Sequence, residues 1–116
     1  MHGYTRNDPP NLFDAADLPQ PATIVPQGSI EANFLAFHEA NPWVYTALVR
    51  LARDMNRRPI GIGMLFEVIR WQYARATVSD DGLRLNNNFR SRYARLIMEQ
   101  EPDLAGVFQI RELTTP

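Results

Sequence analysis

Four arginines lie between residues 84 and 95, and no acidic residue interrupts them. Each guanidinium is a planar fork that donates paired hydrogen bonds to phosphate oxygens or to the acceptor edge of guanine. The small residues Ser91 and Ala94 lie among the arginines and would let a helix approach the floor of a major groove closely. This segment therefore predicts binding to duplex DNA. The candidate nucleic-acid-binding residues are Arg84, Arg90, Ser91, Arg92, Ala94, Arg95 and Arg111.

These arginines are expected to divide between two roles. Arg90, Arg92 and Arg95 would contact the DNA directly from one helix, and Arg84 or Arg111 would bind flanking phosphates. The net charge of the whole chain is -1, and arginines outnumber acids only from residue 42 onward. A single small domain with so few cations should bind weakly. We therefore expect DNA binding to need a homodimer or a larger assembly.

Residues that could carry out catalysis are few and scattered. His2 lies near the start of the chain, and His38 lies near the end of a predicted helix, where a place at the edge of the core is ordinary. The adjacent acids Asp80 and Asp81 are typical of a turn, and no further metal-ligand pattern follows them. No spacing unites a nucleophile, a base and an orienting group. We therefore expect a protein without enzymatic activity, cofactor or metal.

Caps and apolar periodicity predict four helices that would position the arginines. Ser29 is a suitable amino-terminal cap, and Asn41 followed by Pro42 is a favoured start for the next helix. Pro102 ends the last helix, because proline has no backbone N–H with which to continue it. The predicted helices span residues 30–40, 42–56, 64–75 and 89–100.

The last predicted helix has two faces of different character at about 100° per residue. We expect its apolar face to pack on the core and its small and basic face to point outward. The apolar face holds Phe89, Tyr93, Leu96, Ile97 and Gln100, and the outward face holds Ser91, Ala94, Arg95 and Met98. The helix before it is apolar around most of its circumference, Trp71 included, and should be central to the core.

Short apolar segments near Ile60, at Leu83–Leu85 and at Val107–Arg111 extend or alternate like strands. The predicted fold class is therefore mainly α, a compact four-helix domain with a minor β-sheet. A winged helix-turn-helix is one arrangement of these elements. Against that arrangement, the link from Thr77 to Asn86 is longer than the turn of a simple helix-turn-helix.

The first 28 residues differ in composition from the rest of the chain. They contain five prolines and no sustained helical or alternating period, which predicts a flexible Pro-rich amino-terminal arm over 1–28 and a single helical domain over 29–116. Removing the arm should leave the melting temperature nearly unchanged. Its apolar residues Phe13, Leu18 and Ile24 are candidate anchors for a partner protein. No apolar run is long enough for a bilayer, so we expect a cytoplasmic protein without membrane contact.

Distinctive short strings from residue 34 onward carry a family resemblance over residues 34–113. They are Phe37-His38, Ala40-Asn41-Pro42, Val44-Tyr45, Phe66-Glu67, Arg70-Trp71, Leu85-Asn86-Asn87-Asn88, Arg92-Tyr93-Ala94-Arg95-Leu96 and Glu101-Pro102 with Leu104. With these strings the chain resembles a family of small, functionally uncharacterised proteins of phages and prophages. The resemblance implies a viral context and the host cytoplasm. It implies two functions: a phage DNA-binding protein or, as the alternative, a phage inhibitor that docks on a host defence or replication protein.

Overall fold

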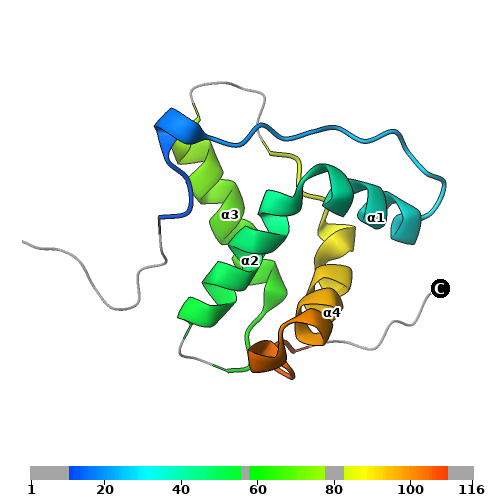
Figure 1. The fold of residues 1–116 in the computed structure, drawn as a ribbon, viewed down its shortest axis with the longest axis vertical. Helices are drawn as coiled ribbons and strands as arrows, with labels where there is room; N and C mark the ends of the chain where they lie inside the picture. Colours follow the sequence, from blue (N-terminus) through cyan, green and yellow to red (C-terminus); the bar gives the residue numbers. More distant parts are fainter. Residues whose placement is uncertain (1–10, 56–57, 78–82, 110–116) are drawn as a thin grey trace, which may run out of the picture.

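Four α-helices form the framework of the part of the chain that the structure describes, as the sequence predicts (Figure 1). The computed structural model describes residues 11–55, 58–77 and 83–109. The α-helices are α1 (Ile30–Ala40), α2 (Pro42–Asp54), α3 (Ile62–Ala76) and α4 (Arg90–Gln100), and the short 3-10 helices are η1 (Ala15–Asp17), η2 (Asn87–Phe89) and η3 (Pro102–Leu104).

Local capping explains the boundaries of the first two helices. The Ser29 hydroxyl accepts a hydrogen bond of 3.1 Å from the backbone N–H of Ala32, which satisfies one of the free donors at the start of α1. Pro42 occupies the first turn of α2, where its missing N–H costs nothing. The predicted span of α1 is confirmed, and α3 begins two residues before the predicted start at residue 64.

The core lies between the inward faces of the four helices. The inward face of α2 carries Val44, Leu48 and Leu51, which follow at spacings of four and three residues and are buried. Phe34 of α1 packs edge-on against Tyr93 of α4, with 4.8 Å between the ring centroids. Such perpendicular ring pairs contribute beyond their buried area because the positive edge of one ring meets the negative face of the other.

The amino-terminal segment 11–28 runs along one edge of the molecule, from the carboxyl end of α3 to the start of α1 (Figure 1). Phe13 is only 7% exposed and lies in the same hydrophobic cluster as the helices. Its ring packs edge-on against Trp43 of α2 and Tyr73 of α3. Residues 11–28 are therefore packed on the body, which revises our prediction of a dispensable arm over 1–28. Residues 1–10 of that arm lie outside the described residues.

Polar side chains of the helices also hold this segment by its backbone. The side-chain amide of Asn41 makes two hydrogen bonds with the backbone of Ala22. Its oxygen accepts from the Ala22 N–H at 2.7 Å, and its nitrogen donates to the Ala22 carbonyl at 2.9 Å. Gln72 accepts from the N–H of Leu12, and the Tyr73 hydroxyl donates to the carbonyl of Pro19. These bonds to main-chain atoms explain how a segment without regular secondary structure is placed along the helices.

The predicted minor sheet is reduced to one contact in the described residues, which contain no strand. Ile60 and Phe108 form an isolated parallel bridge, in which Ile60 donates to the carbonyl of Val107 and accepts from the N–H of Gln109. Two of the three predicted segments therefore meet, and the sheet itself stays a prediction.

Candidate nucleic-acid interface

Helix α4 is rotated about its axis relative to the orientation that we expected. Tyr93, Ala94 and Ile97 are buried, so the inward face is centred between these three residues. Ala94 was expected at the floor of a DNA groove, and this prediction is wrong. Its position on the helix lies only about 60° from that of Ile97, so both side chains face the core.

Arg92 is committed to a contact inside the protein. Its Nε donates to a carboxylate oxygen of Glu31 on α1 at 3.0 Å, and a second nitrogen donates to the carbonyl of Asn88. Only 18% of its side chain is exposed. The guanidinium therefore joins α1 to α4, and binding DNA would require it to leave an existing partner.

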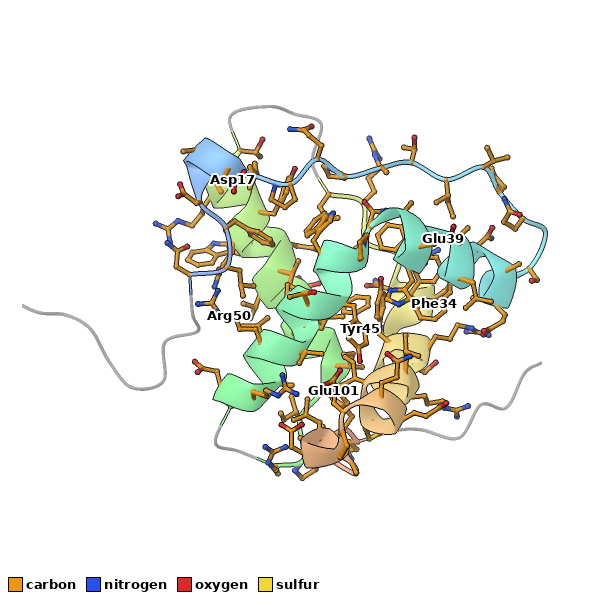
Figure 2. The ribbon with its side chains drawn as sticks, in the orientation of Figure 1. Asp17, Phe34, Glu39, Tyr45, Arg50 and Glu101 are labelled. Atoms are coloured by element: carbon orange, nitrogen blue, oxygen red, sulfur yellow. The ribbon has the colours of Figure 1, made fainter. Side chains whose placement is uncertain are left out.

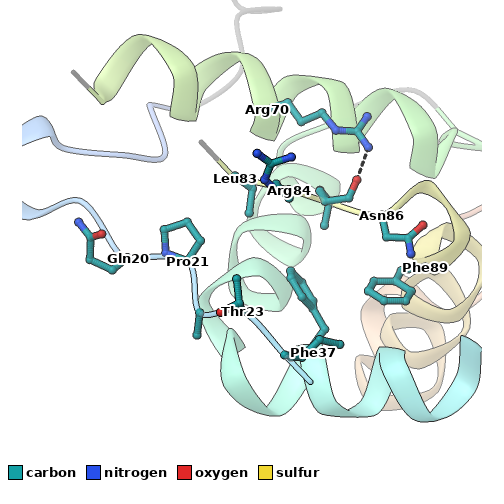
Figure 3. A pocket seen from close by; sticks show the side chains of 12 residues that line it. Gln20, Pro21, Thr23, Phe37, Arg70, Leu83, Arg84, Asn86 and Phe89 are labelled. Atoms are coloured by element: carbon teal, nitrogen blue, oxygen red, sulfur yellow. Dashed lines mark hydrogen bonds between the residues drawn. The ribbon is translucent and has the colours of Figure 1, made fainter. Parts of the chain in front are cut away.

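Arginines from three different segments converge at the amino end of η2 and α4. Arg70 of α3 donates to the side-chain oxygen of Asn87 and to the carbonyl of Leu85. Arg90 donates from Nε to the backbone carbonyl of Asn87 at 3.0 Å. Arg84 is exposed, and with Arg70 it lines one hollow of the surface (Figure 3). Arg70 and Arg90 thus both bind Asn87, and Arg84 joins them only through the hollow that it shares with Arg70. We call these three residues the Asn87 arginine cluster.

A close approach of α3 to α4 allows Arg90 to reach this place. A methyl group built on Gly63 would lie 3.3 Å from the terminal nitrogen Nη1 of Arg90. The absence of a side chain at Gly63 thus leaves room for the guanidinium against the first turn of α3. The arginine is held over the start of its own helix, and the positive end of the helix dipole adds to its charge there.

The hollow beside the cluster has a volume of about 810 Å³ and is open to solvent. Figure 3 shows the rings of Phe37 and Phe89 on one side and Gln20 and Pro21 of the amino-terminal segment on another. Among the described residues the cluster has one acidic contact, an ion pair between Arg70 and the exposed Glu67 three residues earlier. A spacing of three residues on a helix is typical of such a pair. The contact of Arg70 with Asn87 gives no comparable signal in the sequence.

The remaining candidates differ in how available they are. Arg95 is exposed on α4 and has no hydrogen-bond or ion-pair partner within the described part of the chain. Ser91 is half-buried. Arg111 lies outside the described residues. Among the described residues, Arg84 and Arg95 are therefore the two predicted arginines whose guanidinium groups have no protein partner.

A second charged group joins the carboxyl ends of α2 and α4. Arg53 binds Glu101 at 2.7 Å and Asp103 at 2.8 Å, and the Tyr45 hydroxyl donates to Glu101 at 2.8 Å (Figure 2). Hydrogen bonding to Arg53 lowers the pKa of Asp103, and burial followed by the bond to Glu101 raises the pKa of Tyr45. The four side chains are mutually satisfied, so this group serves to hold α4 and η3 against α2.

His38 lies at the edge of the core, as predicted. Its ring stacks on Phe34 and contacts Tyr45 and Tyr93. Burial lowers the pKa of His38 from its ordinary value of 6.5. In the unfolded chain His38 regains that value, so just below pH 6.5 the unfolded state binds more protons than the folded one.

We therefore expect the free energy of unfolding to fall as the pH drops below 6.5. Urea denaturation on both sides of that pH measures the effect. His38→Phe keeps a ring against Phe34 and removes the titrating group, so it should flatten the dependence. An equal dependence in His38→Phe and the parent protein would assign the effect to other groups.

Comparisons with known proteins return no match: no family model fits the chain, and neither a curated protein nor a solved structure is found similar to it. In the described ranges, no helix combines the length and apolar character that a membrane span needs. The same residues contain no group of three or more histidine or acidic side chains that could hold a metal ion. The interpretation of function thus depends on the arrangement of the side chains.

Proposed function

We propose that the protein binds duplex DNA through contacts of the Asn87 arginine cluster and Arg95 with the phosphate backbone. The observation that carries this proposal is that Arg70 and Arg90 both bind Asn87 at the start of α4, while Arg84 lines a surface hollow together with Arg70. Guanidinium groups and a helix amino terminus both favour anions, and here they occupy the same place. Phosphate oxygens are the anions that nucleic acid presents at regular spacing.

Contacts with the backbone are better supported than reading of bases by α4. Ala94 is buried and Arg92 is bound to Glu31, so two of the residues expected in the groove are turned away or engaged. Binding through phosphates positions a protein on DNA without much sequence preference. We therefore expect weak sequence dependence and strong salt dependence. A winged-helix arrangement stays a prediction, and residues 107–109 lie beside Ile60 in an isolated bridge.

The test is a titration of fluorescently labelled duplex DNA at two salt concentrations, roughly 50 and 200 mM. The double variant Arg84→Ala/Arg95→Ala removes two cations that have no described partner, so its fold should be unaffected. We expect its affinity at the lower salt to fall roughly tenfold, and the slope of log affinity against log salt to decrease by about 2.

The matched control is Arg50→Ala/Arg58→Ala, which changes the net charge equally at two exposed positions. Figure 2 shows Arg50 on α2, away from α4. This control should bind DNA nearly as well as the parent protein. Equal weakening by both double variants would indicate a general effect of charge and no defined interface. No binding at the lower salt even at high micromolar protein would end the proposal.

The alternative function is docking on a host protein through the arginine helix or the amino-terminal segment, and one of its three candidate anchors is no longer available. Phe13 is buried against Trp43 and Tyr73 in its own protein. Capture from a host lysate treated with nuclease separates the two functions. A stoichiometric protein partner that survives the nuclease would favour the alternative, and partners that disappear would favour nucleic acid.

A further inference from the structure

Helix α3 exposes large apolar side chains on the side that faces away from the core. Trp71 is 58% exposed and Met64 is 45% exposed, and the half-buried Val68 lies between them. The sequence predicts that Trp71 packs in the core, and this prediction is wrong. A tryptophan side chain contributes strongly to stability or to binding only when its large apolar ring is buried. The exposure of the Trp71 ring therefore needs an explanation.

These residues form one continuous stripe along the helix. Residues 64, 68, 71 and 75 follow at spacings of four, three and four, so their side chains line up on successive turns. The inward side of α3 carries a different set of residues, the buried Leu65, Ile69 and Tyr73. We call the outer stripe, with its charged and small flanks, the Trp71 face: Met64, Glu67, Val68, Trp71, Ala74 and Arg75.

The Trp71 face is complementary in charge to a copy of itself. Glu67 and Arg75 lie four residues before and four residues after Trp71. If two α3 helices pack antiparallel around a two-fold axis at Trp71, Glu67 of each copy lies opposite Arg75 of the other. The same axis brings the two Trp71 side chains against each other, and Val68 and the small Ala74, three residues to either side, lie on the two flanks of the contact. A two-fold interface requires this kind of self-complementarity.

We infer that two copies of this chain pair through their Trp71 faces, with α3 antiparallel to α3. The contacts inside each copy are compatible with this arrangement. The Arg75 guanidinium carbon lies 4.8 Å from the centroid of the Trp71 ring, which orients both groups on the surface. Glu67 pairs with Arg70 on an exposed helix surface, where such a pair contributes little and can be shared with a second cation.

The expected dimer is weak. One face of a helix of 15 residues offers less area than the roughly 800 Å² per partner of a standard stable interface. A dissociation constant of roughly micromolar or above is therefore expected. The pairing goes beyond the proposed DNA binding and does not depend on it, although a dimer would double the number of arginines that one duplex meets.

The experiment measures the mass of the full-length protein in the absence of nucleic acid, by sedimentation over a range of concentrations from roughly 1 to 500 μM. We expect a monomer–dimer equilibrium. Glu67→Arg or Arg75→Glu alone places like charges opposite each other and should weaken the dimer roughly tenfold. The double variant Glu67→Arg/Arg75→Glu restores opposite charges across the axis and should recover the parent equilibrium.

Two further variants locate the contact. Trp71→Ala should abolish the dimer, and Leu35→Ala, at an exposed apolar residue of α1, should leave it unchanged. Circular dichroism confirms that each variant is folded. A protein that is monomeric at every concentration, a dimer insensitive to Trp71→Ala, or a double charge reversal without recovery would each overturn the inference. Since no DNA is present, these outcomes leave the proposed function untouched.

Discussion

Phe13→Ala should lower the free energy of unfolding by about 3 to 5 kcal/mol. The ring is 7% exposed, and its centroid lies 5.7 Å from that of Trp43 and 5.4 Å from that of Tyr73. Removing it leaves a cavity between two aromatic rings that belong to different helices, and α2 and α3 cannot both move to fill it. The melting temperature should fall by roughly 10 °C or more. Thermal and urea denaturation measure both quantities.

Val25→Ala is the matched control, since it shortens an apolar side chain of the same segment that is 76% exposed. It should change the free energy of unfolding by less than about 0.5 kcal/mol. Deleting residues 1–28 should destabilise the protein at least as much as Phe13→Ala does. If Phe13→Ala were as mild as Val25→Ala, residues 11–28 would be the dispensable arm that composition predicts.

Asn41→Ala should cost about 2 to 4 kcal/mol. The Asn41 side chain is fully buried and bonds to three backbone atoms: the N–H of Ala22, the carbonyl of Ala22 and the carbonyl of Phe37. The alanine variant removes the partner of both Ala22 groups, while the Phe37 carbonyl keeps its bond from the backbone N–H of residue 41. An unpaired buried polar group costs more than the bond itself contributed. Urea denaturation monitored by tryptophan fluorescence measures the loss, because Trp43 is close in sequence to Asn41.

A second asparagine provides the comparison for that experiment. The side chain of Asn33 accepts a single hydrogen bond from the N–H of Gln27 at an exposed site, so Asn33→Ala should cost much less. Ala22→Pro removes the N–H that donates to Asn41 without touching the asparagine. Its effect should be less than additive with that of Asn41→Ala, because both changes break the same bond. Full additivity would show that the bond between Asn41 and Ala22 contributes nothing to stability.

Much of the helical framework could be predicted because the signals are local. Ser29 and the Asn41-Pro42 pair determine where α1 and α2 begin, and the α2 stripe determines its inward face. Phe13 gives no such signal. It is one aromatic residue among prolines, without periodicity, and its place between Trp43 and Tyr73 is set by tertiary packing.

The candidate interface could be predicted only in part. The concentration of arginines around α4 is visible in the chain, but their partners are distant: Glu31 is 61 residues from Arg92, and Asn87 is 17 residues from Arg70. The rotation of α4 was missed because an alanine contributes little to an apolar pattern. The predicted inward face was therefore drawn through the larger apolar residues and left Ala94 outside, although a small residue suits a position where helices pack closely.

The attachment of the amino-terminal segment also has a kinetic consequence. Its hydrogen bonds join residues 60, 54 and 19 positions apart, whereas the contacts within each helix span a few positions. Closing a long loop costs entropy before any contact repays it, so we expect the segment to dock after the individual helices have formed. We expect the docked segment to open in the native state as a unit of lower stability than the helices. The amide protons of Leu12 and Ala22 should then exchange with solvent through release of this unit, while the helical core remains closed.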